Sequence, residues 1–344
     1  MNTPSPSSFI DRILPAPVDG GFTMDDYWVW CGSVIQCEDG VWHMFASRWP
    51  KVLPFFEGYL THSEVVRATA SVPEGPYTFQ EVVLPARGPQ FWDGRITHNP
   101  TVHRSGDKYL LFYIGSTYGE DRPIPTPGET LSALYKSPQE CYGNIRIGMA
   151  VASSLAGPWQ RGDRPVFEPR KGAWDESIVT NPAPCVRDDG GILLIYRSNT
   201  PDGLRLGAAL AKDWLHPFER LSDEPIPLFF GSTHVEDPFV WWAGDHYEML
   251  AKDLTGALTG ELHAGVHVTS PDALHWTLLD PAKAYSRTIR WDDGSVTQQG
   301  CLERPQVVFD ERGNPCCLFA ATGDGPGGFN SCQRTWNMAI PLAH

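Results

Sequence analysis

The sequence lacks a long apolar run and an apolar, basic leader. No window approaches the ~18 uninterrupted apolar residues of a membrane-spanning helix. The opening "MNTPSPSSFIDRILPAP" has neither the charged nor the apolar region of an export signal. We therefore expect no membrane association and a cytoplasmic location for the chain as given. A periplasmic or secreted location stays open, because a chain trimmed of its export signal would look the same.

Positive charge and paired cysteines are also scarce. Lys and Arg number 27 against 41 Asp and Glu, which gives a net charge of -14. A field of this sign repels phosphate backbones, so nucleic acid is excluded as an expected partner. The eight cysteines form no CxxC pair, so neither a zinc knuckle nor a disulfide framework is indicated.

Turn-forming residues are abundant instead. The chain of 344 residues holds 33 Gly and 31 Pro, spread evenly along its length. This distribution is typical of many short strands joined by turns, and it predicts few helices. With 41% hydrophobic residues, the chain is long and apolar enough to bury a large core.

One sequence motif occurs in two full copies and three partial ones. "WDGRITHNPTV" (92–102) and "WDESIVTNPAP" (174–184) both read Trp-Asp-x-x-Ile-x-x-Asn-Pro. Asp-Pro at 237–238, Arg-Pro at 304–305 and Cys-Gly at 31–32 stand at the same point of three further copies. Each copy continues as strand, polar turn and strand, so five β-hairpins are predicted. We call the residue before the Pro or Gly the step residue.

A second phrase follows four of the hairpins, at 65–79, 146–161, 204–220 and 264–279. Each instance is an alternating strand, a turn of small residues and an aromatic residue that opens another strand. Every unit is thus a four-stranded antiparallel meander, and five such units predict an all-β, five-bladed β-propeller.

The ends of the chain fit a closed ring. The fifth unit stops one strand short after 336–342, and residues 10–17 resemble a fourth strand. We expect this N-terminal strand to complete the last blade and hide its open edge. The predicted organisation is a loose tail at 1–9 and one propeller domain at 10–344.

Antiparallel meanders place the start of every innermost strand at one mouth of the central channel. Side chains around the steps should therefore converge there. An acid lies seven residues before the Pro or Gly in three copies: Asp25, Asp93 and Asp175. The residues just before the steps are Trp30, His98, Thr180, Glu236 and Glu303. The step residues are Cys31, Asn99, Asn181, Asp237 and Arg304.

The acids at this mouth suit cleavage of a glycosidic bond. That reaction needs one protonated carboxyl group to assist the leaving oxygen and one ionised carboxylate to activate water or attack carbon. Glu236 and Asp237 are the strongest candidates, because adjacent acids at the start of a buried strand are costly unless they are used.

Other polar residues at the mouth have a structural alternative. Asp93 and Asp175 are as well suited to bonding turn amides as to a site, and Asn99 and Asn181 before Pro are equally good turn formers. The pair at 303–304 is either a site element or a local charge-balanced pair.

Cationic and aromatic residues complete the set of candidate ligands. Arg48 and Arg197 each end a second strand, where they either hold a sugar carboxylate or sulfate or neutralise the acids. Trp30 and Trp49 present flat apolar surface on which sugar rings stack, although packing between blades explains them too.

Two histidines near the mouth suggest a cation. His98 and His234 could support a hydrated divalent ion such as calcium in the channel, although lone histidines are more often simply hydrogen-bonded. We expect no cofactor to be required, and the sequence leaves the metal open.

The chain resembles the five-bladed glycoside hydrolases, a group that includes families 43, 117, 62, 32 and 68. "YLLFYIGSTYG", "IRIGMAVASSLAGPW" and "VEDPFVWWAGDHYEML" carry the likeness, which extends from about Ile10 to the end. The resemblance, remote and nearest to families 43 and 117, implies the propeller fold and action on carbohydrates.

Family 43 members resembling this chain use an Asp base, an Asp that tunes the acid and a Glu acid, and they invert the anomeric centre. Glu236 matches the acid position, but Cys31 and Asn181 stand where the two Asp residues are expected. Asp25 then becomes the expected base. His234 would be the acid only in a scheme similar to family 117.

We therefore expect an exo-acting, inverting glycoside hydrolase that releases a terminal sugar from a plant or algal oligosaccharide. Glu236 is the expected acid and Asp25 the expected base, with Asp175 or Asp237 raising the pKa of the acid by like-charge repulsion. The alternatives are a uronic-acid lyase that uses Arg48 and Arg197, and a carbohydrate-binding propeller without catalysis.

Overall fold

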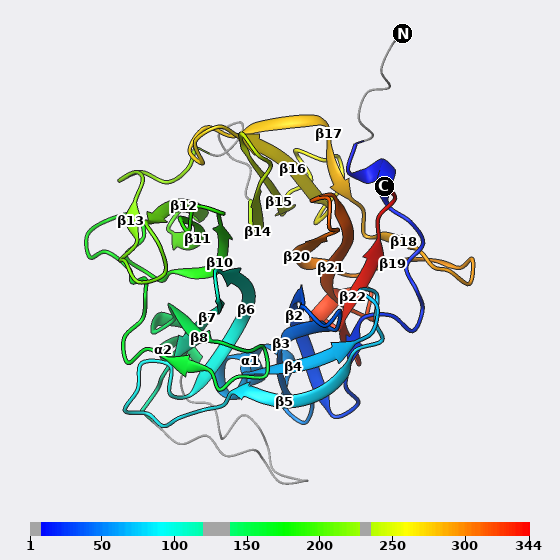
Figure 1. Ribbon diagram of the computed structural model, residues 1–344. Helices are drawn as coiled ribbons and strands as arrows, with labels where there is room; N and C mark the ends of the chain where they lie inside the picture. The colour runs from blue at the N-terminus through cyan, green and yellow to red at the C-terminus, as the bar shows by residue number, and fades with distance from the viewer. Residues whose placement is uncertain (1–7, 120–137, 228–234) are drawn as a thin grey trace.

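The computed structural model describes residues 8–119, 138–227 and 235–344, and these form a ring of four-stranded antiparallel sheets around a central axis (Figure 1). Each of the first four blades runs from the axis outward in chain order. Blade 1 holds β2 (Tyr27–Gln36), β3 (Trp42–Pro50), β4 (Glu64–Ala70) and β5 (Thr78–Leu84). Blade 2 holds β6 (Ile96–Ser105), β7 (Lys108–Ser116), β8 (Arg146–Ala152) and β9 (Gln160–Arg161).

The remaining blades repeat this arrangement, which confirms the predicted five-bladed propeller. Blade 3 holds β10 (Thr180–Val186), β11 (Ile192–Thr200), β12 (Gly203–Ala211) and β13 (Glu219–Arg220). Blade 4 holds β14 (Val235–Trp242), β15 (Tyr247–Asp253), β16 (Gly265–Ser270) and β17 (Thr277–Tyr285). Blade 5 holds β20 (Glu303–Phe309), β21 (Pro315–Gly323), β22 (Thr335–Pro341) and β1 (Phe22–Thr23).

The N-terminal part of the chain closes the ring, but with a later strand than the sequence suggested. β1 pairs with β22 through Phe22 and Asn337. Residues 10–17 contribute a short 3-10 turn and two isolated bridges, from Ile13 to Leu342 and from Ala16 to Trp291. "LPAP" explains the difference, because its two prolines have no N–H to donate to a ladder.

Few elements lie outside the blades in the described part of the chain. Two short helices, α1 (Phe55–His62) and α2 (Pro138–Gly143), follow β3 and β7 and contact each other. A hairpin of β18 (Thr288–Arg290) and β19 (Val296–Gln298) links blades 4 and 5. No described helix has the length and apolar character needed to cross a membrane.

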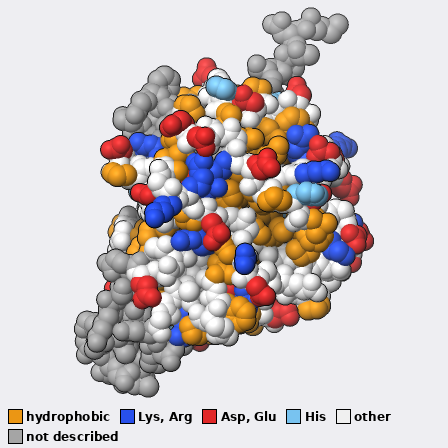
Figure 2. Space-filling view, turned by 90° about the vertical axis from the view of Figure 1, so that its left-hand side faces the viewer, with side chains coloured by type: hydrophobic (Ala, Val, Ile, Leu, Met, Phe, Trp, Pro, Cys, Tyr) orange, Lys and Arg blue, Asp and Glu red, His pale blue; other side chains and the backbone are white. Residues whose placement is uncertain are grey.

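Apolar side chains fill the spaces between neighbouring blades. One cluster joins Phe112 of blade 2 to Leu194 of blade 3, and another joins Ile195 of blade 3 to Met249 of blade 4. In Figure 2, which views the left edge of the ring in Figure 1, acidic and basic side chains are intermixed with apolar ones. The net negative charge is therefore not gathered into a single patch on that face.

Every innermost strand contains the same backbone irregularity. The strand's register shifts at the step, as between Trp30 and Ser33 of β2. All five step residues adopt the left-handed conformation, with φ between 49° and 56°. Asn and Asp tolerate this region best among residues with a side chain, which is why the phrase reads Asn-Pro twice and Asp-Pro once.

The repeated Trp-Asp phrase has a structural purpose in blade 2. The Asp93 carboxylate is fully buried and accepts hydrogen bonds from Arg87 Nε at 2.6 Å and from the Tyr113 hydroxyl at 2.7 Å. Arg161 Nη1 lies 3.4 Å from Asp93 Oδ2, the oxygen that accepts from Tyr113. The stacked rings of Trp92 and Tyr113, 5.8 Å apart at 21°, cover this cluster.

Blade 3 repeats the arrangement. The buried Asp175 accepts from Arg170 Nε at 3.0 Å, from Arg220 Nε at 2.7 Å and from the Tyr196 hydroxyl at 2.9 Å. Trp174 stacks on Tyr196 at 5.8 Å and 16°. The phrase therefore encodes a buried ionic lock that ties the entrance of a blade to its outer strands.

This lock predicts a large and selective loss of stability. Asp93→Ala leaves two largely buried guanidinium groups, 16% and 11% exposed, without this anion, so the free energy of unfolding should fall by about 3 kcal/mol. Asp163→Ala is the matched control, because largely exposed Asp163 contacts the same Arg87 at 3.6 Å. Its loss should cost less than about 1 kcal/mol. Urea denaturation of both variants checks this, and equal effects would contradict the lock.

Candidate functional site

The five step residues meet at the axis in a chain of hydrogen bonds. Cys31 Sγ donates to Asn99 Oδ1 at 2.8 Å, and Asn99 Nδ2 donates to Asn181 Oδ1 at 2.9 Å. Asn181 Nδ2 donates to Asp237 Oδ1 at 2.7 Å, and the backbone N–H of Arg304 donates to Asp237 Oδ2 at 3.2 Å. One residue from each blade thus takes part, and Asp237 accepts from both of its neighbours, one at each carboxylate oxygen.

Directly at this axial chain lies a pocket of about 310 Å³. The starts of the innermost strands form its base, and residues of α1 and of the 327–330 segment form part of its wall. Most of the residues that the sequence predicted for the site line it: Trp30, Trp49, His98, Asn99, Asn181, Arg197, Glu236, Asp237, Glu303 and Arg304.

Three predicted acids do not reach the pocket. Asp25 lies exposed in the turn between β1 and β2 and is not among the lining residues, which removes the expected base. Asp93 and Asp175 are buried within their blades by the ionic locks and have no surface at the mouth. His234 lies outside the described residues.

Arg48 is the fourth predicted residue that the structure places elsewhere. Its guanidinium group pairs with Glu64 at 2.9 Å and lies 4.1 Å from the ring centre of Tyr27. The register explains why: Ser47, not Arg48, takes the cross-strand position that Arg197 takes in blade 3. Successive residues of a strand point to opposite faces, so an offset of one residue turns the side chain away from the mouth.

Sequence reasoning missed the central cation of the pocket, Lys252. Its Nζ lies 3.1 Å from Glu236 Oε2, 3.0 Å from Glu303 Oε1 and 3.4 Å from Asp237 Oδ2, and its side chain is 4% exposed. Lys252 ends β15 opposite Glu236, the same cross-strand position that Arg197 occupies in β11. Aligning the ends of the second strands by this position would have found it.

The two glutamates have opposite protonation tendencies. Burial raises the pKa of Glu236, but attraction to Lys252 and Arg197 outweighs it and lowers the pKa to about 2. For Glu303, burial together with repulsion from Asp237 and Glu236 outweighs the attraction to Lys252 and raises the pKa to about 7. The pocket therefore holds Glu236 as a carboxylate beside a Glu303 whose protonated form is favoured.

The acid cluster is neutralised by side chains of this chain. Burial lowers the pKa of Lys252, but the three carboxylates overcome this and raise the pKa well above its usual value. Among the described residues, no group of three or more His, Cys, Asp or Glu side chains is arranged to hold a metal ion. Calcium in the acid cluster does not fit, because the ammonium group already lies within contact of all three acids.

His98 lines the pocket as a neutral, hydrogen-bonded side chain. Its Nδ1 lies 2.7 Å from Ser63 Oγ, and its ring packs 4.4 Å from that of Tyr59. Burial, and then the charge of Arg304, hold the pKa of His98 well below its usual range. His98 therefore fits the second of its two interpretations, a simply hydrogen-bonded histidine.

The two predicted stacking tryptophans act mainly as packing. Trp49 is fully buried, and Trp30 is 5% exposed. Both contact Phe55 edge to face at 4.9 Å, and Phe55 in turn stacks on Phe329 at 5.2 Å. More accessible aromatic surface at the pocket comes from Phe56, which is 52% exposed, and from the partly buried rings of Phe55, Tyr59, Tyr142 and Phe329.

Several donors at the base of the pocket have no acceptor among the described residues. Arg304 is 3% exposed, and its Nε and Nη1 make no hydrogen bond within the described part of the chain, although Nη1 lies 3.7 Å from Asp237. Nε of Arg197 is also buried without an acceptor in residues 8–119, 138–227 and 235–344. Such groups cost about 1–3 kcal/mol each while they stay unpaired, and a ligand with oxygen acceptors would relieve that cost.

Comparison with known proteins rests on solved structures. No protein-family model matches the chain, and no curated protein matches it. A glycoside hydrolase is similar over 97% of this chain and 93% of its own, with 15% identity and a TM-score of 0.67. The chain has the fold of the five-bladed glycoside hydrolases. The predicted resemblance is thereby confirmed at the level of architecture.

Two further structures are similar over nearly the whole chain. A family 117 glycoside hydrolase of the marine bacterium Zobellia galactanivorans has 16% identity and a TM-score of 0.62, with 92% of this chain and 85% of that chain covered. A family 43 β-xylosidase/α-arabinofuranosidase from a compost metagenome has 16% identity and a TM-score of 0.61, with 96% of each chain covered.

The raised pKa of Glu303 predicts a pH-dependent gain on mutation. The pKa of Glu303 is about 7 in the folded state and 4.5 ordinarily. The protonated side chain therefore contributes stability that is fully present below pH 4.5 and is lost as the pH rises through 7. At pH 8 the free energy of unfolding of Glu303→Gln should therefore exceed that of wild type by about 1–3 kcal/mol. At pH 5 the two values should be nearly equal.

Denaturation at both pH values measures this effect. Glu311→Gln, in the exposed turn between β20 and β21, is the control and should show no such difference. A Glu303→Gln variant that is less stable than wild type at pH 8 would show that the carboxylate form of Glu303 is favoured by the fold.

Proposed function

We propose that this protein is a glycoside hydrolase that releases a terminal sugar from a plant or algal oligosaccharide bound in the mouth pocket. The observation that carries the proposal is the pair of buried carboxyl groups, Glu236 and Glu303, that share one ammonium group and differ in pKa. Two carboxyl groups held in opposite protonation states are the chemical requirement of glycosidic cleavage. The similar architecture of known glycoside hydrolases supports it.

The pKa values assign the roles. Glu303 is the proton donor to the leaving oxygen, because its raised pKa favours the protonated form. Glu236 is the ionised partner that activates water or attacks the anomeric carbon. This differs from the expectation that Glu236 donates and Asp25 accepts, since Arg197 and Lys252 hold Glu236 as a carboxylate and Asp25 lies outside the pocket.

In this proposal Asp237 tunes Glu303, whereas from the sequence we expected Asp175 or Asp237 to raise the pKa of Glu236. It lies next to Glu236 in β14, and its charge is one of the causes that raise the pKa of Glu303. Asp237 itself is held at the axis by the N–H groups of Asn181 and Arg304, so it is not free to react. Lys252 fixes the carboxyl groups relative to each other.

Two arguments about stereochemistry point in opposite directions. Both reactive oxygens contact Lys252 Nζ at about 3 Å, so they lie no more than about 6 Å apart, nearer to the spacing of retaining enzymes than of inverting ones. The resemblance to family 43 favours inversion instead. The anomer of the first product decides between them.

The shape of the pocket favours action at a chain end. Its volume of about 310 Å³ is at the small end of ligand pockets, and the axial hydrogen bonds form its base. The unpaired N–H groups of Arg304 and the Tyr142 hydroxyl, which Arg197 approaches at 3.1 Å, are available to bind sugar hydroxyls. The compost enzyme named above was solved with xylotriose, a compact oligosaccharide of this kind.

The alternatives are less well supported. The lyase hypothesis used Arg48 and Arg197 as a clamp for a uronate, and Arg48 points away from the pocket. A propeller that binds sugar without cleaving it would not need carboxyl groups with separated pKa values.

The experiment is a panel of aryl glycosides and oligosaccharides followed by NMR, with wild type and three variants. Glu303→Gln and Glu236→Gln should each lower kcat by at least about 10²–10⁴-fold, because each removes one half of the acid and base pair. Asp25→Asn is the matched control and should retain activity, since its side chain lies outside the pocket.

The same spectra separate the alternatives. An unsaturated product would identify a lyase. Saccharide binding without any product, unaffected in the two Gln variants, would identify a binding propeller. Wild-type turnover by both Gln variants would remove these two residues from the reaction.

A further inference from the structure

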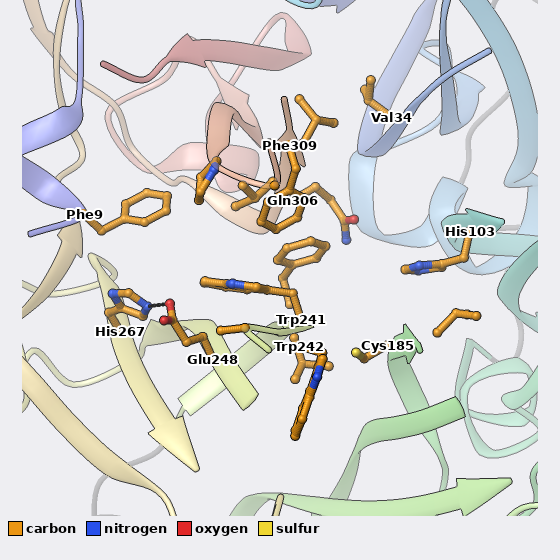
Figure 3. Close-up of a pocket in the computed structure, with 18 of the residues that line it drawn as sticks. Phe9, Val34, His103, Cys185, Trp241, Trp242, Glu248, His267, Gln306 and Phe309 are labelled. Atoms are coloured by element: carbon orange, nitrogen blue, oxygen red, sulfur yellow. Dashed lines mark hydrogen bonds and ion pairs between the residues drawn. The ribbon is translucent and has the colours of Figure 1, made fainter. Parts of the chain in front are cut away.

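A second and larger cavity lies at the opposite mouth of the channel. Its volume is about 1060 Å³, and the far ends of all five innermost strands line it. Figure 3 shows aromatic side chains around its centre. The axial chain of step residues belongs to the other pocket, and Ser33 and Gln306, just past their steps, belong to this one. The two cavities therefore share an axis without sharing a lining residue.

Trp241 provides a supported aromatic platform in this cavity. It is only partly buried, and three rings hold it in place: Phe239 at 5.8 Å, Phe309 at 5.9 Å and His267 at 5.6 Å and 29°. Because its neighbours fix its orientation, the exposed part of the indole is preorganised for a flat apolar partner.

A second indole flanks the first. Trp242 packs against Tyr247 with ring centres 4.7 Å apart, and the Arg187 guanidinium lies 4.9 Å from its ring centre. Trp241 and Trp242 are consecutive in β14 and so lie on opposite faces of the blade. In Figure 3 both stand at the cavity, which gives it two separate aromatic walls.

A largely buried amide lines the cavity. Gln306 is 5% exposed, and its Oε1 accepts from Ser33 Oγ at 3.3 Å. Figure 3 shows the amide group directed into the cavity, where its Nε2 can donate to a ligand oxygen.

Several charged groups that line this cavity are paired within the protein. Glu248 accepts from His267 Nε2 at 2.8 Å and lies 3.3 Å from His246 Nε2. At the edge, Arg187 pairs with Asp189 at 2.8 Å, and Arg104 pairs with Glu38 at 2.6 Å. Arg12 donates to the carbonyl oxygens of Ala343 and Pro315, so three of the four arginines that line the cavity have partners, and the fourth, Arg312, is exposed. A phosphate or sulfate ligand needs several free cations, so the arrangement favours a ligand without net charge.

We propose that the cavity is a second, non-catalytic binding site for a neutral oligosaccharide. One sugar ring stacks on Trp241, a second lies against Trp242, and a hydroxyl oxygen accepts from Gln306 Nε2. Aromatic faces combined with a few fixed polar groups match the alternating apolar and hydroxyl surfaces of a sugar chain. The site uses no residue of the mouth pocket, so it is independent of the proposed hydrolase activity.

Isothermal titration calorimetry with xylotriose, arabinotriose and galactotriose tests the site. The background is full-length Glu236→Gln/Glu303→Gln protein, in which the mouth pocket should not consume the probes. Trp241→Ala should weaken binding of at least one probe by about tenfold or more, and Trp241→Phe, which keeps a ring in the platform, should recover part of it.

Trp291→Ala is the matched control. Trp291 packs against the same apolar cluster as Trp241 but does not line the cavity, so its loss should not change the affinity. Thermal unfolding of each variant verifies folding. Binding of no probe, or equal effects of Trp241→Ala and Trp291→Ala, would overturn the proposal. Trp241-dependent binding in a wild-type protein that cleaves nothing would support this site and reject the hydrolase.

Discussion

The hydrogen-bonded chain of left-handed residues at the axis is the constraint on which the rest of the structure depends. Each innermost strand must place one side chain inward at the same height, and only the left-handed bulge does so without breaking the strand. Conformational strain of about 1–3 kcal/mol at Cys31 and Arg304, which are poorly suited to this region, is accepted because the axis is thereby joined across all blades. The bulge also directs the preceding residues, Glu236 and Glu303, into the mouth pocket.

Within that pocket, one buried ammonium group organises three carboxyl groups. Lys252 cannot neutralise all of them, so the acid with extra cationic contact, Glu236, stays ionised and the acid with the least, Glu303, retains its proton. The two pKa values differ because Glu236 contacts more cationic groups than Glu303 does, and buried charges interact strongly where the surroundings are of low polarity. An enzyme that needs an acid and a base close together obtains both from chemically identical side chains.

The sequence repeat could be interpreted only in part. Five blades, their innermost strands and the common mouth followed from the spacing of the Asn-Pro steps, because period and turn chemistry are local properties. The Trp-Asp half of the phrase was placed at the mouth as well, but Asp93 and Asp175 are buried in ionic locks. Each has one arginine partner nearby in the chain, Arg87 or Arg170, but the second partner, Arg161 or Arg220, comes from an outer strand far along the chain. The local pattern alone therefore could not reveal the complete lock.

The sequence by itself determined the architecture and the candidate acids, because strand alternation and turn residues depend on neighbours in the chain. Only the tertiary structure decided which side chains meet. An offset of one residue in β3 turns Arg48 away from the pocket, whereas Lys252 of β15 lies opposite Glu236 and enters the acid cluster. The register between two strands cannot be derived from the sequence of either strand alone. The protonation of Glu236 and Glu303 was likewise decided by the fold, since burial and nearby charge exist only once five distant segments share one axis.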